Sequence, residues 1–324
     1  AYEQASDAPD WTELRNRAEQ TETPVQLARI PAGRPIFTCG VDCQGDRVEC
    51  QLVAHGRDNR SHTVDYIVIP HHIGTDECRA ELDKLLKRKW RNAHGRDIEI
   101  DRLAIDGGAY TDDVWDWAKR WPWNRVIITK GANSATGPLY QLQKFERRRD
   151  GRAKRRHQKR AYLVNVSALK ATLYADLKKE DPAARGYQSF AAGLGDHFYK
   201  MLCSERRILK RNRHGVIESA WVPVQAGGPN EALDNRIMAD VAARLEGSRS
   251  NTDADWDALE AARDCPPEEA QRDLFDRTAA EALPPPPPPP VQSEAPEQGP
   301  QPTNAAAGET GNHVAALFSN LRKK

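Results

Sequence analysis

Two short apolar runs in this chain each end in an aspartate that is followed by turn residues. The segment 36–46 contains an apolar run that reaches Asp42 shortly before a Gln-Gly turn. The segment 102–110 contains a second run that reaches Asp106 directly before two glycines. A run of roughly four to eight β-prone residues bounded by turn residues predicts a buried strand. Ligands of open α/β sheets gather beyond the carboxyl ends of the strands. Two carboxylates placed there predict a site for a hard cation.

The elements between and after these runs predict the order of a mixed sheet. Three strand-like runs, 36–43, 47–56 and 62–70, are joined by short turns and form an antiparallel meander. A helix over residues 75–90, capped by Thr75, returns the chain to a strand at 103–106, so that this strand is parallel to the first. A helix at 111–121 and a strand at 125–129 repeat the pattern. The fold class is α/β, with a ribonuclease-H-like mixed sheet of order 3-2-1-4-5 flanked by helices. In that order the first and fourth strands are neighbours, which places Asp42 beside Asp106.

The rest of the chain divides into a continuation of this domain and a tail. We expect a strand at 162–166, a helix at 167–179 capped by Ser167, a strand at 187–190, a helix at 196–205, a hairpin of 207–210 with 219–224, and a helix at 230–246. The predicted organisation is a lead-in with one helix at 1–35, a domain at 36–247, an acidic and then Pro-rich flexible linker at 248–311, and a short amphipathic helix at 312–324.

The tail is expected to be largely disordered and to end in a docking segment. Seven consecutive prolines at 284–290 indicate a polyproline II spacer. Beyond them, four apolar residues follow the i, i+3, i+4, i+7 spacing of one helix face: Val314, Leu317, Phe318 and Leu321. An apolar-faced helix on a flexible tether is suited to docking in the groove of a partner.

A third acid, Asp234 in the first turn of the 230–246 helix, completes a candidate catalytic and metal-binding set with Asp42 and Asp106. Carboxylates crowded together stay ionised when cations bind between them, and oxygen ligands select Mg²⁺ or Mn²⁺. Two such ions about 4 Å apart support in-line hydrolysis of a phosphodiester. Each acid also has a simpler interpretation, as a turn residue or as a complement to the helix dipole. Three further acids are second-tier ligand candidates: Asp46, Glu231 and Asp196.

Basic residues predict contacts with nucleic acid. Lys130 ends the 125–129 strand and could neutralise a phosphate beside the metals, although a solvated lysine is an equal interpretation. Residues 144–160 are too charged to pack, and we interpret them as an arm that contacts the DNA backbone without base specificity. The alternative is a solvated loop. The arm's candidate DNA-binding residues are Arg147, Arg148, Arg149, Arg152, Lys154, Arg155 and Arg156.

Composition excludes some classes of protein. The net charge is only +1, and no apolar run approaches the roughly 20 residues that cross a bilayer, so no membrane association is expected. The six cysteines lack metal-finger spacing and indicate a reduced, intracellular protein.

Four segments, taken together and in order, resemble the nuclease domain of the lambda-type (GpA family) large terminase subunit of tailed bacteriophages. They are 38–49 (TCGVDCQGDRVE), 104–108 (AIDGG), 128–131 (ITKG) and 230–236 (NEALDNR), within a likeness that covers about residues 11–245. The resemblance implies a ribonuclease-H-like endonuclease that cuts concatemeric double-stranded DNA during genome packaging, with Asp42, Asp106 and Asp234 as the metal-binding acids. Where the family often has an acid, this chain has Gly45, which leaves the ligand role of Asp46 open.

The resemblance also implies partners and a location. These are an ATPase domain of the same polypeptide, a small terminase subunit that chooses the cleavage site, the portal protein as the dock of the C-terminal helix, and the cytoplasm of the infected bacterial host. This chain contains no G-x-x-x-x-G-K-S/T phosphate loop and starts with alanine, so we expect it to be a C-terminal part of such a subunit.

Two other functions remain open at the level of the sequence. A ribonuclease-H-like recombinase or junction resolvase would use the same acids on branched DNA. A non-enzymatic DNA-binding or scaffold module would use the basic arm and the terminal helix, with the acids serving only structure.

Overall fold

The computed structural model describes residues 8–132, 137–143, 160–211, 215 and 217–266. All of these belong to one compact unit, Ala1–Ala280. The unit contains an eight-stranded mixed sheet of order β11-β4-β3-β2-β7-β8-β10-β9. The strands are β2 (Ile36–Cys43), β3 (Val48–His55), β4 (Ser61–Ile69), β7 (Arg102–Asp106), β8 (Val126–Gly131), β9 (Tyr140–Gln143), β10 (Ala161–Val164) and β11 (Gln188–Phe190).

The five central strands lie in the order β4-β3-β2-β7-β8, which is the order that the sequence predicts for the five runs. β2, β3 and β4 are antiparallel neighbours, whereas β7 and β8 run parallel to β2. All eight residues of β2 and all eight of β3 are buried, because helices or further chain cover both faces of the sheet there. A strand buried on both faces commonly reads as a nearly continuous apolar run, as most of β2 does. β3 instead alternates apolar residues with Glu49 and Gln51, which are buried as well.

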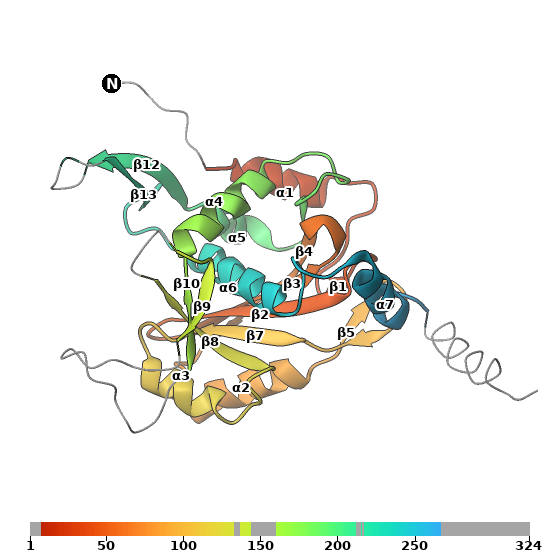
Figure 1. The fold of residues 1–324 in the computed structure, drawn as a ribbon, viewed down its shortest axis with the longest axis horizontal. Helices are drawn as coiled ribbons and strands as arrows, with labels where there is room; N and C mark the ends of the chain where they lie inside the picture. Colours follow the sequence, from red (N-terminus) through yellow and green to blue (C-terminus); the bar gives the residue numbers. More distant parts are fainter. Residues whose placement is uncertain (1–7, 133–136, 144–159, 212–214, 216, 267–324) are drawn as a thin grey trace, which may run out of the picture. The chain divides into compact units, whose positions relative to one another are not determined.

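Helices cover the two faces of the sheet (Figure 1). On one face lie α2 (Asp76–Lys87) and α3 (Thr111–Ala118), whose apolar side chains join one buried cluster. On the other face lie α1 (Trp11–Glu19), α4 (Val166–Leu177), α5 (Gly195–Leu202) and α6 (Glu231–Leu245), which form a second cluster. The remaining elements are η1 (Arg57–Asn59), a small sheet of β1 (Arg29–Ile30), β5 (Trp90–Asn92) and β6 (Asp97–Ile98), the hairpin of β12 (Glu205–Arg211) and β13 (Ile217–Pro223), and α7 (Asp253–Arg263).

α6 packs directly on the backbone of β2 because Gly40 has no side chain. A Cβ atom built on Gly40 would lie 1.8 Å from the carbonyl oxygen of Asn235 and 2.8 Å from the amide nitrogen of Ala239. Both atoms belong to the α6 backbone and cannot rotate away. On the strand side, the Asn235 amide donates to the carbonyl of Glu49 at 3.1 Å. The missing side chain of Gly40 therefore allows the short distance between α6 and the sheet.

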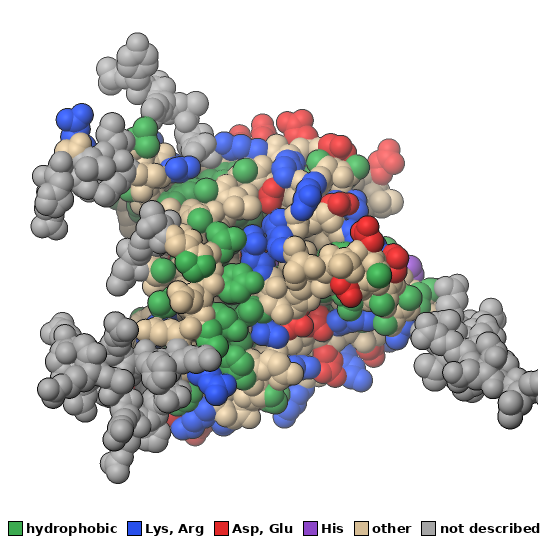
Figure 2. All heavy atoms as spheres, in the orientation of Figure 1, with side chains coloured by type: hydrophobic (Ala, Val, Ile, Leu, Met, Phe, Trp, Pro, Cys, Tyr) green, Lys and Arg blue, Asp and Glu red, His purple; other side chains and the backbone are tan. Residues whose placement is uncertain are grey.

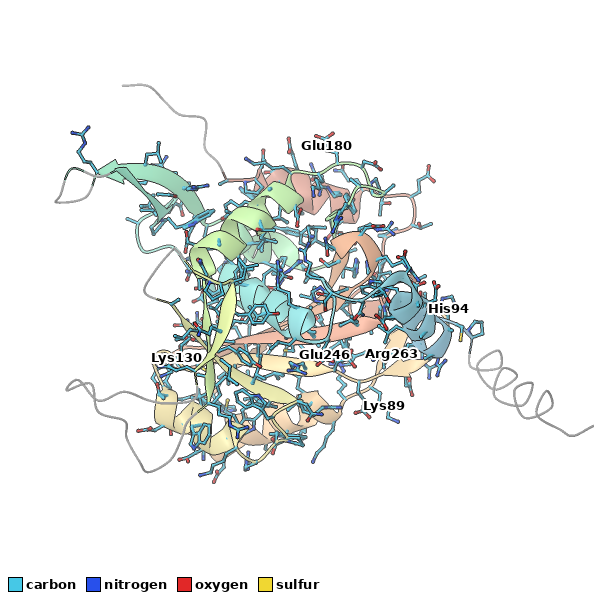
Figure 3. All side chains as sticks on the ribbon, viewed as in Figure 1. Lys89, His94, Lys130, Glu180, Glu246 and Arg263 are labelled. Carbon is cyan, nitrogen blue, oxygen red and sulfur yellow. The ribbon has the colours of Figure 1, made fainter. Side chains whose placement is uncertain are left out.

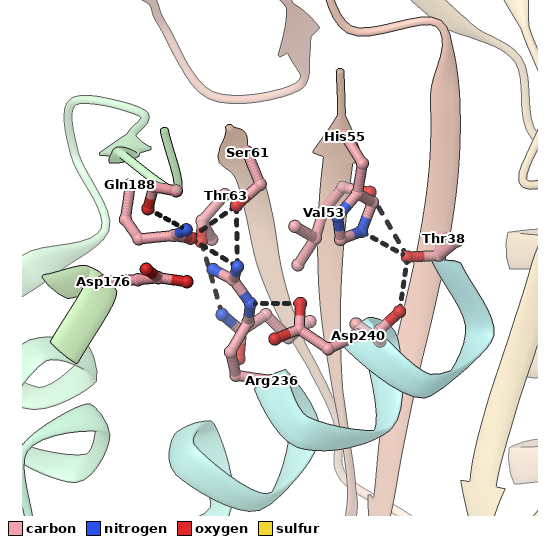
Figure 4. Close-up of polar contacts among 12 residues, drawn as sticks. Thr38, Val53, His55, Ser61, Thr63, Asp176, Gln188, Arg236 and Asp240 are labelled. Atoms are coloured by element: carbon pink, nitrogen blue, oxygen red, sulfur yellow. Dashed lines mark hydrogen bonds and ion pairs between the residues drawn. The ribbon is translucent and has the colours of Figure 1, made fainter. Parts of the chain in front are cut away.

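A second contact holds the middle of α6 through a buried arginine (Figure 4). Arg236 is 1% exposed, and its guanidinium donates to Asp240 on the same helix at 3.0 Å and to Ser61 of β4 at 2.7 Å. It also donates to Gln188 of β11. One turn further on, the Thr38 hydroxyl of β2 donates to the carbonyl of Ala239 at 3.0 Å. Together with the bond from Asn235 to β3, these contacts attach α6 to four strands, β2, β3, β4 and β11.

The compact unit includes helices on both sides of the range 36–247. Leu14 of α1 is 1% exposed within the second cluster, and Trp256 of α7 is 5% exposed. Arg57 pairs with three acids of α7, and Arg263 pairs with Asp101 at 2.7 Å. Figure 2 shows the resulting mixture of acidic and basic side chains on the surface around α7.

The helix caps agree with the sequence at α2 and differ at α4. The Thr75 hydroxyl accepts from the amide of Cys78 at 3.2 Å, as predicted. The prediction of Ser167 as the cap of the next long helix is wrong, because α4 begins earlier and its cap is Asn165, whose side chain accepts from the amide of Ala168 at 3.1 Å. Ser167 lies inside the first turn and accepts from the indole of Trp221 instead.

Candidate functional site

A cavity of about 230 Å³ lies at the carboxyl ends of β2, β7 and β8 and beside the start of α6. Its lining includes the three predicted acids, Asp42, Asp106 and Asp234, together with Lys130 and Lys170. The acids come from three separate elements and from positions far apart in the chain. The fold therefore brings the three candidate residues to one cavity.

Asp42 and Asp106 are placed by the parallel pairing of β2 with β7. Val41 pairs with Ile105 in that register. Asp42 and Asp106, the next residue of each strand, therefore lie at the same end of the sheet. Neutral groups support both carboxylates. The Gln44 side-chain amide donates to Asp42 at 2.6 Å, and the Gly108 backbone amide donates to Asp106 at 3.1 Å.

Asp234 reaches the cavity from the first turn of α6, and charged groups support it. Lys170 of α4 lies 2.9 Å from Asp234 Oδ1 and 2.9 Å from Oε1 of Glu205, at the start of β12. The side-chain amide of Asn230 donates to Asp234 Oδ2 and to the same Glu205 oxygen, both at 3.0 Å. Lys170 is 5% exposed and Glu205 9%, so this network lies largely out of solvent.

The acids raise one another's affinity for protons. Burial raises the pKa of Asp42 to about 6, the hydrogen bond from Gln44 opposes the rise, and the charges of Asp106 and Asp234 add to it. Burial also raises the pKa of Asp106, with the Gly108 amide opposing and Asp234 adding. For Asp234, burial raises the pKa while Lys170 opposes the rise. Bringing a cation between these groups would relieve this repulsion.

The donor chemistry of the cavity fits a hard divalent cation at Asp42 and Asp106. At Asp234 the oxygens already have other partners. Three carboxylates offer only oxygen ligands, the set that Mg²⁺ and Mn²⁺ prefer. Within the described ranges, no group of three or more His, Cys, Asp or Glu side chains is arranged as a metal ion would require. Both oxygens of Asp234 are engaged by Lys170 and Asn230, whereas Asp42 accepts from the Gln44 side-chain amide and Asp106 from the Gly108 backbone amide.

Lys130 lies beside Asp106, as the strand order predicts, because Asp106 pairs with Thr129 in the register of β7 and β8. Figure 3 shows it at the left end of the sheet, with Glu246 and Arg263 toward the other end. Its ammonium donates to the Thr111 hydroxyl at 3.1 Å, and its charge lowers the pKa of Asp106 against the effect of burial. Lys130 also lines a small second cavity of about 30 Å³ together with Arg160, so a second cation lies near Lys130.

The second-tier acids do not line the cavity. Arg47 engages both Asp46, at 3.0 Å, and Glu231, at 2.9 Å. Asp196 of α5 pairs with Arg15 of α1 at 3.0 Å and is 49% exposed. The basic-arm residues between 147 and 156 and the docking residues between 314 and 321 lie outside the described residues.

Lys170 and Glu205 are the site residues that the sequence analysis missed. A signal for Lys170 was present, because it stands among the apolar residues Leu169, Leu173 and Leu177 at helical spacing. A lysine on the buried face of a helix requires a partner, since an unpaired buried charge is costly. Glu205 carried no comparable signal, because it opens a strand that is otherwise rich in exposed basic residues.

The fold and the cavity define an α/β protein with an acidic, oxygen-rich site at the carboxyl edge of a mixed sheet. The family described as "Terminase large subunit gpA, endonuclease domain" matches residues 1–256, and the chain belongs to this family. It is similar to "Terminase, large subunit" of Enterobacteria phage P21, with 26% identity over 236 residues. The match covers 70% of this chain and 35% of that relative, so the chain spans about a third of the relative's length.

No helix in the described part of the chain is long and apolar enough to span a membrane.

Proposed function

We propose that this chain is a metal-dependent endonuclease that cuts double-stranded concatemeric DNA during phage genome packaging. The observation that carries the proposal is the convergence of Asp42, Asp106 and Asp234 on one cavity. Membership of the terminase endonuclease family supports the same activity. We further propose that the sheet is of the ribonuclease-H-like type, which the strand order β4-β3-β2-β7-β8 supports.

The residues of the cavity have distinct roles in this proposal. Asp42 and Asp106, fixed on adjacent strands, would hold divalent cations together with Asp234. Two Mg²⁺ or Mn²⁺ ions would supply the Lewis acidity for in-line hydrolysis of a phosphodiester. Lys130 lies where a phosphate bound beside Asp106 would meet a positive charge, and Arg160 lines a small second cavity with Lys130. These two basic side chains would neutralise phosphates of the DNA backbone, which gives affinity without sequence preference.

The proposed partners follow from the family and from the named relative. The relative from phage P21 is a large terminase subunit of which this chain spans about a third. We propose an ATPase domain of the same polypeptide, a small terminase subunit and the portal protein as partners, with the basic arm on DNA and the terminal helix on the portal. The host cytoplasm is the proposed site of action.

Nicking and linearisation of supercoiled plasmid test the proposed activity. The parent chain is incubated with Mg²⁺, with Mn²⁺ or with EDTA, beside the variants Asp106→Asn and Asp46→Asn. Asp106→Asn keeps the side-chain shape and removes a charge from the cavity, whereas Asp46 is 79% exposed and outside it. We expect the parent and Asp46→Asn to cut only with metal, and Asp106→Asn to lose at least about 100-fold in rate. Equal cutting by Asp106→Asn, or cutting in EDTA, would refute the proposal.

A further inference from the structure

Lys170 is a buried cation in a cavity that is also lined by three carboxylates and by Lys130. It projects from α4, is 5% exposed, and lies 2.9 Å from one oxygen of Asp234 and 2.9 Å from one oxygen of Glu205. Because α4, β12 and α6 each contribute one member, the ion pairs connect three elements at the wall of the cavity. The ammonium therefore occupies a position beside Asp234 that a metal ion would compete for.

The three acids of the cavity have different hydrogen-bond and ion-pair partners. Asp42 accepts a hydrogen bond from the Gln44 amide, and Asp106 accepts one from the Gly108 backbone. Both donors are neutral, and although the charge of Lys130 also acts on Asp106, its ammonium donates to the Thr111 hydroxyl. Asp234 has a cation on Oδ1 and the Asn230 amide on Oδ2. A divalent ion can thus approach Asp42 and Asp106 without meeting a bound cation, but it meets one at Asp234.

We propose that Lys170 withholds Asp234 from one of the two metal ions, so that the cavity binds a first ion readily and a second ion only weakly. The inference rests on the proposed metal-dependent function and deepens it. Two positive charges on one carboxylate repel each other strongly in a site that is largely out of solvent. Binding of the second ion requires Lys170 to give up its contact with Asp234 and retain only Glu205, at the loss of a charge-assisted hydrogen bond.

A purely structural role for Lys170 predicts the opposite effect on metal binding. If the ion pairs only tied α4, β12 and α6 together, their removal would loosen the cavity and weaken both metal ions. If Lys170 withholds Asp234, removing the ammonium frees an oxygen ligand and strengthens the second ion. The sign of the change in affinity for the second ion distinguishes the two roles.

The decisive variant is the double substitution Lys170→Met with Glu205→Gln. It removes one positive and one negative buried charge, so the net charge is unchanged, and Asp234 is the carboxylate that loses its lysine partner. Replacing both members of a buried pair by neutral groups of similar size is often well tolerated. The single variant Glu205→Gln serves as its counterpart, because Lys170 then has only Asp234 as an acidic partner and holds it more tightly.

The measurement is a titration of the full 324-residue chain with Mn²⁺ alone, followed by calorimetry and by the electron paramagnetic resonance signal of free Mn²⁺. We expect two binding steps in the parent. The second should be about tenfold tighter in the double variant, which equals about 1.4 kcal/mol and is the low end for a hydrogen bond to a charged group. It should be weaker than in the parent in Glu205→Gln. Lys130→Met is the control for lost positive charge, since Lys130 contacts the Thr111 hydroxyl, and it should strengthen the second step less than the double variant does.

A second step that is unchanged or weaker in the double variant would overturn the inference while leaving the metal centre intact. If the double variant shows no cooperative thermal transition, Glu205→Gln decides alone, and a second step as tight as that of the parent or tighter overturns the inference. Absence of Mn²⁺ binding to the parent, or binding that survives Asp42→Asn and Asp106→Asn unchanged, would overturn both the inference and the proposed function.

Discussion

Because Gly40 of β2 contacts the backbone of α6, a substitution at Gly40 tests how α6 and its Asp234 are held against the sheet. In Gly40→Ala the new methyl group would lie 1.8 Å from the Asn235 carbonyl oxygen, whereas ordinary contact begins near 3.4 Å. α6 must therefore withdraw from β2 by about 1.6 Å. Because the obstacle is backbone, no side-chain rotation relieves it. Overpacking of this kind costs about 2–3 kcal/mol, toward the upper end of the usual range.

The withdrawal of α6 moves Asp234 relative to Asp42 and Asp106, which the sheet holds. We expect the melting temperature of Gly40→Ala to fall by about 5–10 °C. Below the melting transition the plasmid cleavage rate should fall by about 100-fold, the usual consequence of a displacement of about 1 Å in a catalytic arrangement.

The matched control is Gly45→Ala, where the added methyl group would meet only the Tyr110 hydroxyl at 3.4 Å. This variant should melt and cut as the parent does. Differential scanning calorimetry and a plasmid assay at a temperature where all three proteins are folded give the two readouts. A Gly40→Ala protein that melts within about 1 °C of the parent and cuts at the parental rate would refute the close approach of α6 to β2.

Two further predictions concern the buried charges. Because burial raises the pKa of Asp42 from 3.8 to about 6, its ionised form is disfavoured in the folded protein. Its contribution to stability is fully present below pH 3.8 and is lost as the pH rises to about 6, an effect of about 3 kcal/mol. In EDTA, Asp42→Asn should therefore raise the melting temperature at pH 7 and flatten its dependence between pH 4 and 7; an unchanged pH slope would contradict this. Arg236→Met should cost about 3 kcal/mol in urea denaturation because it leaves the partners of a buried guanidinium unpaired. Arg15→Met, which breaks a pair with a 49% exposed Asp196, should cost less than about 1 kcal/mol; equal losses would contradict the difference in burial.

The central sheet could be predicted because its signals are local. β2 is mostly apolar, β3 alternates apolar and polar residues, and both are bounded by turns. Thr75 caps the following helix, so both the order of five strands and the neighbourhood of Asp42 and Asp106 follow. The cap of α4 was missed because asparagine and serine are both good caps and stand two residues apart. The choice between them depends on where the chain leaves β10.

The network around Asp234 could not be predicted in the same way, because it depends on contacts between distant segments. Lys170 and Glu205 are 35 residues apart in sequence, and Asp234 comes later still. The helical spacing shows that Lys170 faces inward, but not which acid it meets. The attachment of α7 through Arg57 and Arg263 is likewise made by side chains far apart in the sequence.

The position of Asp234 depends on α6, whereas Asp42 and Asp106 belong to the sheet, and this division separates the effects of the proposed variants. Gly40→Ala moves the whole helix and carries Asp234 away from the other two acids, so it should weaken the second metal ion. The double substitution at Lys170 and Glu205 leaves the helix in place and frees one oxygen of Asp234, so it should strengthen that ion. If both variants acted only by lowering stability, both would weaken metal binding. Opposite changes in the affinity for the second ion would therefore show that metal binding depends on both the position and the ion pair of Asp234.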